Sequence, residues 1–212
     1  MIDANEHDSI ERARAVLRQY RVGALACDGR VQPRRFIIDP ADGSLVLELT
    51  RQELDANEHV LHVPEEQLPG ASDTSLQLLL SLEAIDPDIA HVCDRFIAAH
   101  GRRSLGRWAR ALIESGRYAG CVIPGEALMT PNPVRADEGA LLRRLNADRS
   151  ALARALLAGA GVQDDGPVAV ACDTHGFDVR AGVGVVRVEF PSPRTTRDEI
   201  EHEIDAILGH SA

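Results

Sequence analysis

Residues 167–190 read PVAVACDTHGFDVRAGVGVVRVEF, and this stretch decides the fold of the C-terminal part of the chain. Valines alternate with small residues at its start, turn-forming residues fill 172–176, and apolar residues alternate again from Phe177. A second turn at 181–182 leads into a β-branched run that ends at Phe190. The stretch therefore predicts antiparallel strands joined by tight turns.

Amphipathic helices are expected on both sides of this stretch. Residues 137–157 carry leucines along one stripe, with acids at the start and glycines after the end, which predicts one continuous helix. The last helix begins at Thr196, where Glu199 completes a capping box. We therefore predict a small α+β domain over residues 135–212, in which two helices cover an antiparallel sheet.

The preceding part, residues 1–134, has the pattern of an antiparallel β domain. Short apolar segments are separated by turn residues such as Asp28-Gly29, which indicates a meander rather than a parallel sheet. The strands are expected at 22–27, 31–39, 44–49, 59–63, 75–85, 111–114 and 118–123. The predicted fold class is thus α+β: an antiparallel split β-barrel with peripheral helices, followed by the small C-terminal domain.

Two helices are expected around these strands. The first is predicted to begin at a capping box formed by Asp8 and Glu11, and the second to open at Pro87 and end at Gly101. The segment MTPNPVR, residues 129–135, contains two prolines that neither a helix nor a central strand accepts. It is the predicted boundary between the two domains.

Charge and cysteine content restrict the classes of function. The 212-residue chain has a formal net charge of −10 and contains no lysine, which argues against general binding to nucleic acids or anionic lipids. Its four cysteines form no CxxC pair, which is typical of reduced thiols in the cytoplasm. The N-terminus lacks an apolar leader, and no apolar run reaches membrane-spanning length. We expect a cytoplasmic protein.

Segments of the first domain resemble the pyridoxamine-phosphate-oxidase-like FMN-binding split barrel. They are ARAVLRQYRVGALAC from residue 13, VQPRRFIIDPADGSLVLELT from residue 31, LLLSLEAID from residue 78 and GRYAGCVIPGEALMTPNPV from residue 116. The C-terminal segments LLRRLNADRSALARALL, DTHGFDVR and VVRVEFPSP are similar to the small domain fused to such barrels in haem-iron-utilisation proteins. The resemblance implies a homodimer with a cofactor site between its subunits, and haem as the cofactor, with FMN as the alternative.

The chain departs from the C-terminal family pattern at two histidines. The family signature His-Met-Asn-x-Asp-His matches residues 144–149, where Arg144 and Arg149 replace the histidines while Asn146 and Asp148 remain. Imidazole is a usual neutral ligand for iron, and a guanidinium cannot take its place. Any activity that needs those histidines is therefore in question.

A partial flavin-phosphate motif gives the candidate cofactor-binding residues. In the family pattern an arginine on the second strand and a threonine after the third hold the FMN phosphate, and the matching residues here are Arg35, Thr50 and Arg51. The lysine of the pattern is missing, and Glu53 and Asp55 follow closely, which disfavours a doubly charged phosphate. The alternative interpretation is a solvated barrel rim.

Other candidates are weaker. His175 lies in a predicted turn, and His59 and His62 point to opposite faces if their segment is a strand, so no metal site is predicted. Cys27 is read as a buried strand residue. The basic segment 102–110, which holds Trp108, is expected either to bind an anion or to form a solvated helix packed on the barrel.

Three hypotheses of function remain open. The first is a dimer that binds haem, stores it or assists its degradation, and the second is an FMN-dependent oxidoreductase. The third is a cofactor-free dimer that binds a protein partner. No catalytic residue can be assigned from the sequence.

Overall fold

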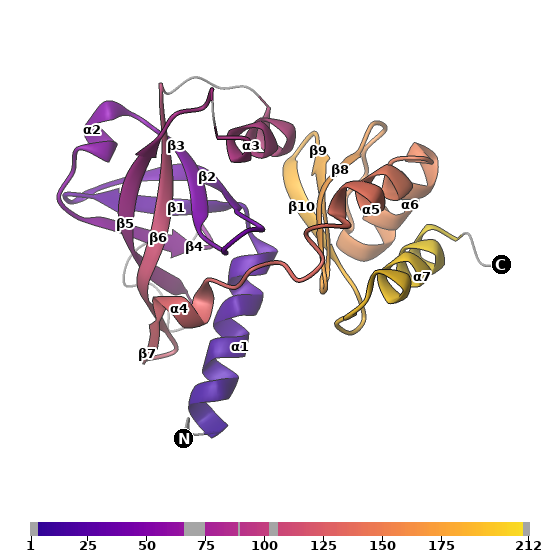
Figure 1. The fold of residues 1–212 in the computed structure, drawn as a ribbon, viewed down its shortest axis with the longest axis horizontal. Coiled ribbons are helices and arrows are strands. Elements are labelled where there is room, and N and C mark those ends of the chain that lie inside the picture. Colours follow the sequence, from indigo (N-terminus) through magenta and orange to yellow (C-terminus); the bar gives the residue numbers. More distant parts are fainter. Residues whose placement is uncertain (1–3, 66–74, 89, 102–105, 210–212) are drawn as a thin grey trace. The chain divides into compact units, whose positions relative to one another are not determined.

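The computed structural model describes residues 4–65, 75–88, 90–101 and 106–209, with side chains from His7 onward. The chain divides into two compact units (Figure 1). The first comprises residues 1–130 apart from 98–100, and the second comprises residues 131–212 together with 98–100. Among the described residues, no helix has both the length and the apolar character needed to span a membrane.

The first unit is built on a seven-stranded antiparallel sheet that closes into a barrel. Its strands are β1 (Val22–Cys27), β2 (Arg30–Ile38), β3 (Leu45–Leu49), β4 (His59–Val63), β5 (Leu76–Ile85), β6 (Arg107–Tyr118) and β7 (Cys121–Pro124). Their order is β3-β2-β1-β4-β5-β6-β7, and β3 also pairs with β6. That additional pairing closes the first six strands into a barrel, because the two ends of the six-stranded array meet.

Short helices surround this barrel, namely α1 (Ala4–Gln19), α2 (Arg51–Leu54), α3 (Val92–His100) and α4 (Gly125–Leu128). The barrel core is aliphatic, and the apolar stripe of α1 with Leu17 joins it. Helix α4 approaches the wall so closely that a Cβ on Gly125 would lie 1.7 Å from the Ile113 carbonyl oxygen. Glycine is therefore required where α4 meets β6.

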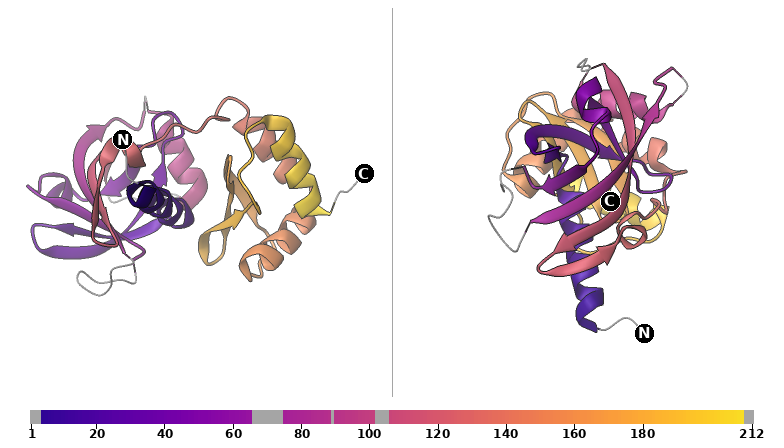
Figure 2. Two further views of the ribbon diagram at one scale, coloured as in Figure 1. Left: turned by 90° about the horizontal axis from the view of Figure 1, so that it is seen from below. Right: turned by 90° about the vertical axis from the view of Figure 1, so that its left-hand side faces the viewer.

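The second unit is a three-stranded antiparallel sheet with helices on one face (Figure 2). Its strands β8 (Val168–Asp173), β9 (Gly176–Ala181) and β10 (Gly184–Glu189) lie in the order β10-β9-β8. The helices are α5 (Glu138–Leu145), α6 (Arg149–Ala160) and α7 (Arg197–Leu208). Alternate residues such as Phe177 and Val179 pack with helix residues such as Leu141 and Ile200 in a separate core.

Side chains bind the edge of β8 that faces away from β9. The Asn146 amide pairs with Ala169 twice, accepting from its N–H and donating to its carbonyl, both at 2.9 Å. Further along, the Cys172 N–H donates to Glu138 at 3.0 Å, and Asn132 donates to the Cys172 carbonyl at 2.9 Å. These groups take the place of a neighbouring strand.

The predicted α+β class is confirmed, and the helix predicted over residues 137–157 is wrong in one respect. It is broken at 146–148 into α5 and α6, so three helices rather than two cover the sheet. Asp148 has an extended backbone, and its carboxylate accepts a 3.0 Å hydrogen bond from the Ala151 N–H, which starts α6. Asparagine and aspartate compete with helical hydrogen bonding in this way, and the leucine stripe does not reveal it.

Two further predictions for the first unit are wrong. Residues 111–114 lie in β6 and the second half of 118–123 lies in β7, but the break predicted at 115–116 is wrong, because β6 runs from Arg107 to Tyr118 and the turn follows at 119–120. Gly116 serves packing rather than a turn, since a Cβ there would lie 2.5 Å from Leu128. Trp108 lies on this strand, not on a helix, and its ring meets Phe96 of α3 edge-on at 5.0 Å between centroids. Residues 102–105 lie outside the described residues.

The capping box predicted at Asp8 and Glu11 is also wrong. Helix α1 already begins at Ala4, so Asp8 lies inside it. Its carboxylate forms an exposed ion pair with Arg12 at 2.8 Å, and the Glu11 carboxylate pairs with Arg14. The same acidic residues thus support the helix through i,i+4 and i,i+3 contacts instead of capping it.

Candidate functional site

Side chains along β2 alternate between the two faces of the strand, and those that face the barrel interior are polar at one end. Phe36 points into the core, so the residues two, four and six positions before it point the same way. Those residues are Arg34, Gln32 and Arg30. The interior wall therefore changes from aliphatic to cationic and polar toward the start of the strand.

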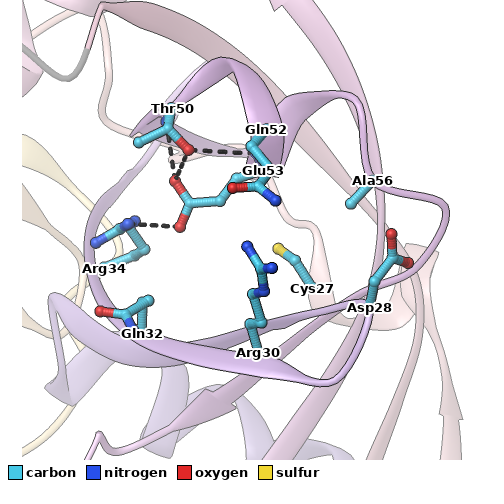
Figure 3. A pocket seen from close by; sticks show the side chains of 9 residues that line it. All are labelled: Cys27, Asp28, Arg30, Gln32, Arg34, Thr50, Gln52, Glu53 and Ala56. Atoms are coloured by element: carbon cyan, nitrogen blue, oxygen red, sulfur yellow. Dashed lines mark hydrogen bonds and ion pairs between the residues drawn. The ribbon is translucent and has the colours of Figure 1, made fainter.

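Helix α2 lies over this polar end. It begins with a complete capping box, in which Thr50 and Glu53 each accept from the other's backbone N–H. Between α2 and β2 lies a pocket of about 480 Å³, within the range of small-molecule sites. Nine residues line it: Cys27, Asp28, Arg30, Gln32, Arg34, Thr50, Gln52, Glu53 and Ala56 (Figure 3). We call it the barrel-mouth pocket.

The Glu53 carboxylate is the best-bonded group in this pocket. One oxygen accepts from the Thr50 N–H at 2.9 Å and the Thr50 hydroxyl at 2.7 Å. The other lies 2.5 Å from the Arg34 guanidinium, and the two side chains are only 12% and 15% exposed. Burial acts to raise the pKa of Glu53, but the bonds from Thr50 and Arg34 outweigh it and hold the pKa below its usual range.

The pocket also has a guanidinium that the other lining residues do not use. Arg34 is occupied: it donates from one terminal nitrogen to the Pro33 carbonyl at 2.7 Å, and its Nε is shielded from solvent, with no acceptor among the described residues. Arg30 directs its guanidinium into the pocket and forms no ion pair with the other residues drawn in Figure 3. The Arg30 guanidinium is therefore open to a ligand that brings a negatively charged acceptor.

Cys27 is the only sulfur group in the lining. Burial raises the pKa of its thiol to about 11, and the nearby Glu53 carboxylate adds to the effect. The thiol is thus protonated near neutral pH, whereas nucleophiles and metal ligands are thiolates. None of the nine lining residues is a histidine, so the described lining offers no ready ligand for iron.

The three residues expected to hold a phosphate do not gather in this pocket. Thr50 lines it, and its hydroxyl is bonded to Glu53. Arg35 follows Arg34 on β2 and therefore points to the opposite face. Arg51 is exposed and pairs with Asp55 at 3.3 Å. The sequence indicates Glu53 only as a charge that disfavours phosphate, and it does not predict that Glu53 pairs with Arg34. The spacing of residues 30, 32 and 34 from the core residue and the capping-box spacing are the signals that point to this pair.

The matched signature in the second unit has structural roles at its retained positions. Asn146 covers the edge of β8, and Asp148 caps α6. Arg144, which replaces the first histidine, is 43% exposed and pairs with Asp205 and Glu201 on α7. Arg149 is exposed at the start of α6. Asn146 and Asp148, the residues of the signature that this chain retains, thus have structural roles.

The histidine candidates form no metal site. His59 and His62 both lie on β4, where the ring of His59 contacts the Glu53 carbonyl at 2.7 Å. The Nδ1 of His62 is buried without a hydrogen-bond partner among the described residues, and burial lowers the pKa of this imidazole. Within the described ranges no three histidine, cysteine, aspartate or glutamate side chains are grouped so that they could hold a metal ion.

His175 belongs to a turn that is fixed by a buried ion-pair cluster. Its N–H donates to Asp173 at 2.7 Å. Asp173 and Asp178 lie 2.6 and 3.1 Å from Arg187, whose side chain is 2% exposed. Burial raises the pKa of Asp173, but Arg187 and the His175 N–H reverse this and hold it below the usual value. These contacts indicate a structural role for the turn.

Comparison with known proteins supports the fold alone. No protein-family model matches the chain, and no curated protein matches it. The structure of the protein Atu2129 from Agrobacterium tumefaciens str. C58, of unknown function, matches with a TM-score of 0.71 and 21% identity over 98% of both chains. A heme binding protein from Mycobacterium smegmatis matches with a TM-score of 0.45 and 19% identity over 95% of this chain and 96% of that one. The first match shows that the fold occurs in a second protein.

Proposed function

We propose that the barrel-mouth pocket binds an organic ligand through carboxylate groups, and that haem, held by its propionates, is that ligand. The observation that carries the proposal is the pair of guanidinium groups in one pocket, Arg30 and Arg34, of which Arg30 forms no ion pair with the other lining residues drawn in Figure 3. Arginine binds carboxylates through charge-assisted and often bidentate hydrogen bonds. Haem is the cofactor implied by the resemblance to haem-iron-utilisation proteins, and it carries two propionates.

The lining residues can bind the propionates of haem, but they offer no ligand for its iron. Arg30 and Arg34 would hold the carboxylates, with Gln32 and Gln52 as further donors. The lining contains no histidine, and the Cys27 thiol is neutral because its pKa is about 11. We therefore propose a binding role in which the iron contributes little to affinity, and we assign no ring-opening chemistry to these residues.

The test compares ligands that differ in one group. Hemin, iron-free protoporphyrin IX and its dimethyl ester are titrated into the full chain, and quenching of Trp108 fluorescence and calorimetry report binding. Hemin and protoporphyrin are expected to bind within about threefold of each other, and the ester at least about tenfold more weakly, because one charged hydrogen bond is worth more than 1.4 kcal/mol.

Matched variants locate the binding. Arg30→Gln and Arg34→Gln should each weaken hemin binding, whereas Arg51→Gln removes an exposed arginine outside the lining and should not. The proposal fails if hemin does not bind, or if the dimethyl ester binds as tightly as the free acid. Binding of hemin without protoporphyrin would also overturn it, since the iron would then carry the affinity.

A further inference from the structure

We propose that Glu53 sets the charge of the group that the barrel-mouth pocket binds, so that it accepts singly charged carboxylate groups and rejects a doubly charged phosphate group. The inference rests on the proposed function only in requiring that this pocket bind an anion. It assigns to Glu53 a role in specificity that differs from its part in the capping box.

The donors that a phosphate would use are already bonded to Glu53. The hydroxyl and N–H of Thr50 both donate to one carboxylate oxygen, at 2.7 and 2.9 Å. The other oxygen faces a terminal nitrogen of Arg34 at 2.5 Å. The Glu53 carboxylate is thus held as an internal anion at the donors that a bound phosphate would need.

One guanidinium of the lining remains for a ligand. Arg30 directs it into the pocket and forms no ion pair with the other lining residues drawn in Figure 3. Among the described residues of the lining, the charges of Arg30 and Arg34 balance those of Asp28 and Glu53. Each carboxylate group of a ligand brings one negative charge to its contact, whereas a phosphate monoester concentrates about two on one group above its second pKa near 6.

Glu53 is the acid that discriminates, because it is the buried one. Its side chain is 12% exposed, and repulsion between like charges is strongest where water is excluded. Asp28 is exposed and accepts from the Asn57 N–H at 3.2 Å, so water and that bond screen its charge. The donors around Glu53 favour its charged form, so the repulsion persists at neutral pH.

The experiment uses two probes of similar shape, benzoate and phenyl phosphate, titrated calorimetrically at pH 8 into three proteins. The wild type should bind benzoate at least about tenfold more tightly than phenyl phosphate. Glu53→Gln should shift this preference toward phosphate by about tenfold or more, since it removes one buried like charge. Asp55→Asn removes an exposed acid just after α2, outside the lining, and should leave the preference unchanged.

Two features keep the test decisive. Glutamine also completes a capping box, so Glu53→Gln preserves the start of α2. In addition, a measurement on the wild type needs no variant. It should bind phenyl phosphate more weakly at pH 8 than at pH 5, because the phosphate loses its second proton between these two pH values. Benzoate is singly charged at both pH values, so its affinity should change little.

An equal preference in wild type and Glu53→Gln overturns the inference, as does phenyl phosphate binding that does not weaken from pH 5 to pH 8. A shifted preference without hemin binding would leave the inference standing and sink the haem proposal. If hemin binds but Glu53→Gln leaves the preference between benzoate and phenyl phosphate unchanged, the haem proposal stands and the inference about Glu53 fails. If neither probe binds any of the three proteins, the inference fails, and the hemin titration alone decides the haem proposal.

Discussion

The carboxylate of Glu53 and the guanidinium of Arg34 form a largely buried ion pair that joins α2 to β2. Glu53 is also the capping-box residue of α2. The same carboxylate therefore fixes a four-residue helix, which would be unstable alone, and determines the electrostatics of the pocket beneath it.

The stability contributed by Glu53 should depend on pH. Because its pKa in the folded protein lies below the usual value of 4.5, its stabilising effect is present above that value and is lost as the pH falls through the folded pKa. Glu53→Gln should lower the free energy of unfolding by about 1.5 kcal/mol or more at pH 7, as for hydrogen bonds to charged groups. Urea unfolding of both proteins from pH 7 to pH 3 should show the difference narrowing below pH 4.5. A constant difference would contradict this assignment.

Cys27 should react with alkylating agents slowly, and faster when Glu53 is neutral. Burial and then Glu53 raise the pKa of its thiol to about 11, so little thiolate exists near neutral pH. In Glu53→Gln the rate of iodoacetamide reaction at pH 9 should rise about threefold for each half-unit fall in that pKa. Peptide-resolved mass spectrometry measures it, with the buried Cys172 as the internal control. An unchanged Cys27 rate would show that Glu53 does not act on this thiol.

Local patterns predicted most of the elements, and contacts distant in sequence account for the errors. The strands at 22–27 and 59–63 and the capping box at Thr196 are confirmed, because alternation and capping depend on near neighbours. The break in the predicted helix 137–157 combines a local cap by Asp148 with bonds between Asn146 and β8 that span 23 residues, and the leucine stripe reveals neither. The pocket required knowledge that β3 pairs with β6, which closes the barrel and makes the start of β2 its mouth.

Asn146→Ala should destabilise the second unit. It removes both hydrogen bonds to Ala169 and a third, at 2.9 Å, to the Leu142 carbonyl. The expected loss is about 2–4 kcal/mol, since buried backbone groups are left without partners. Chemical denaturation measures it, and Arg143→Ala on the exposed face of α5 is the control. A loss near that of the control would mean that water replaces the amide at no cost.

Arg187→Leu should be more damaging than the removal of all three charges of its cluster. Alone it leaves Asp173 and Asp178 without their common cation, at an expected cost of about 3–5 kcal/mol. The triple variant with Asp173→Asn and Asp178→Asn should recover part of that loss, because no buried charge is left uncompensated. Denaturation midpoints measure the stability of the two variants. A triple variant no more stable than Arg187→Leu would contradict the prediction that uncompensated buried charges cause the loss.

The side chains that bind the edge of β8 also determine where a further strand could be added to the three-stranded sheet. A further strand, from another chain or from an unfolded copy, needs the N–H and carbonyl groups of an edge strand. At β8 such a strand would first have to displace Asn146, Asn132 and Glu138 from Ala169 and Cys172. Pairing between copies of this sheet is therefore disfavoured at β8, and the direction left for strand addition is past β10.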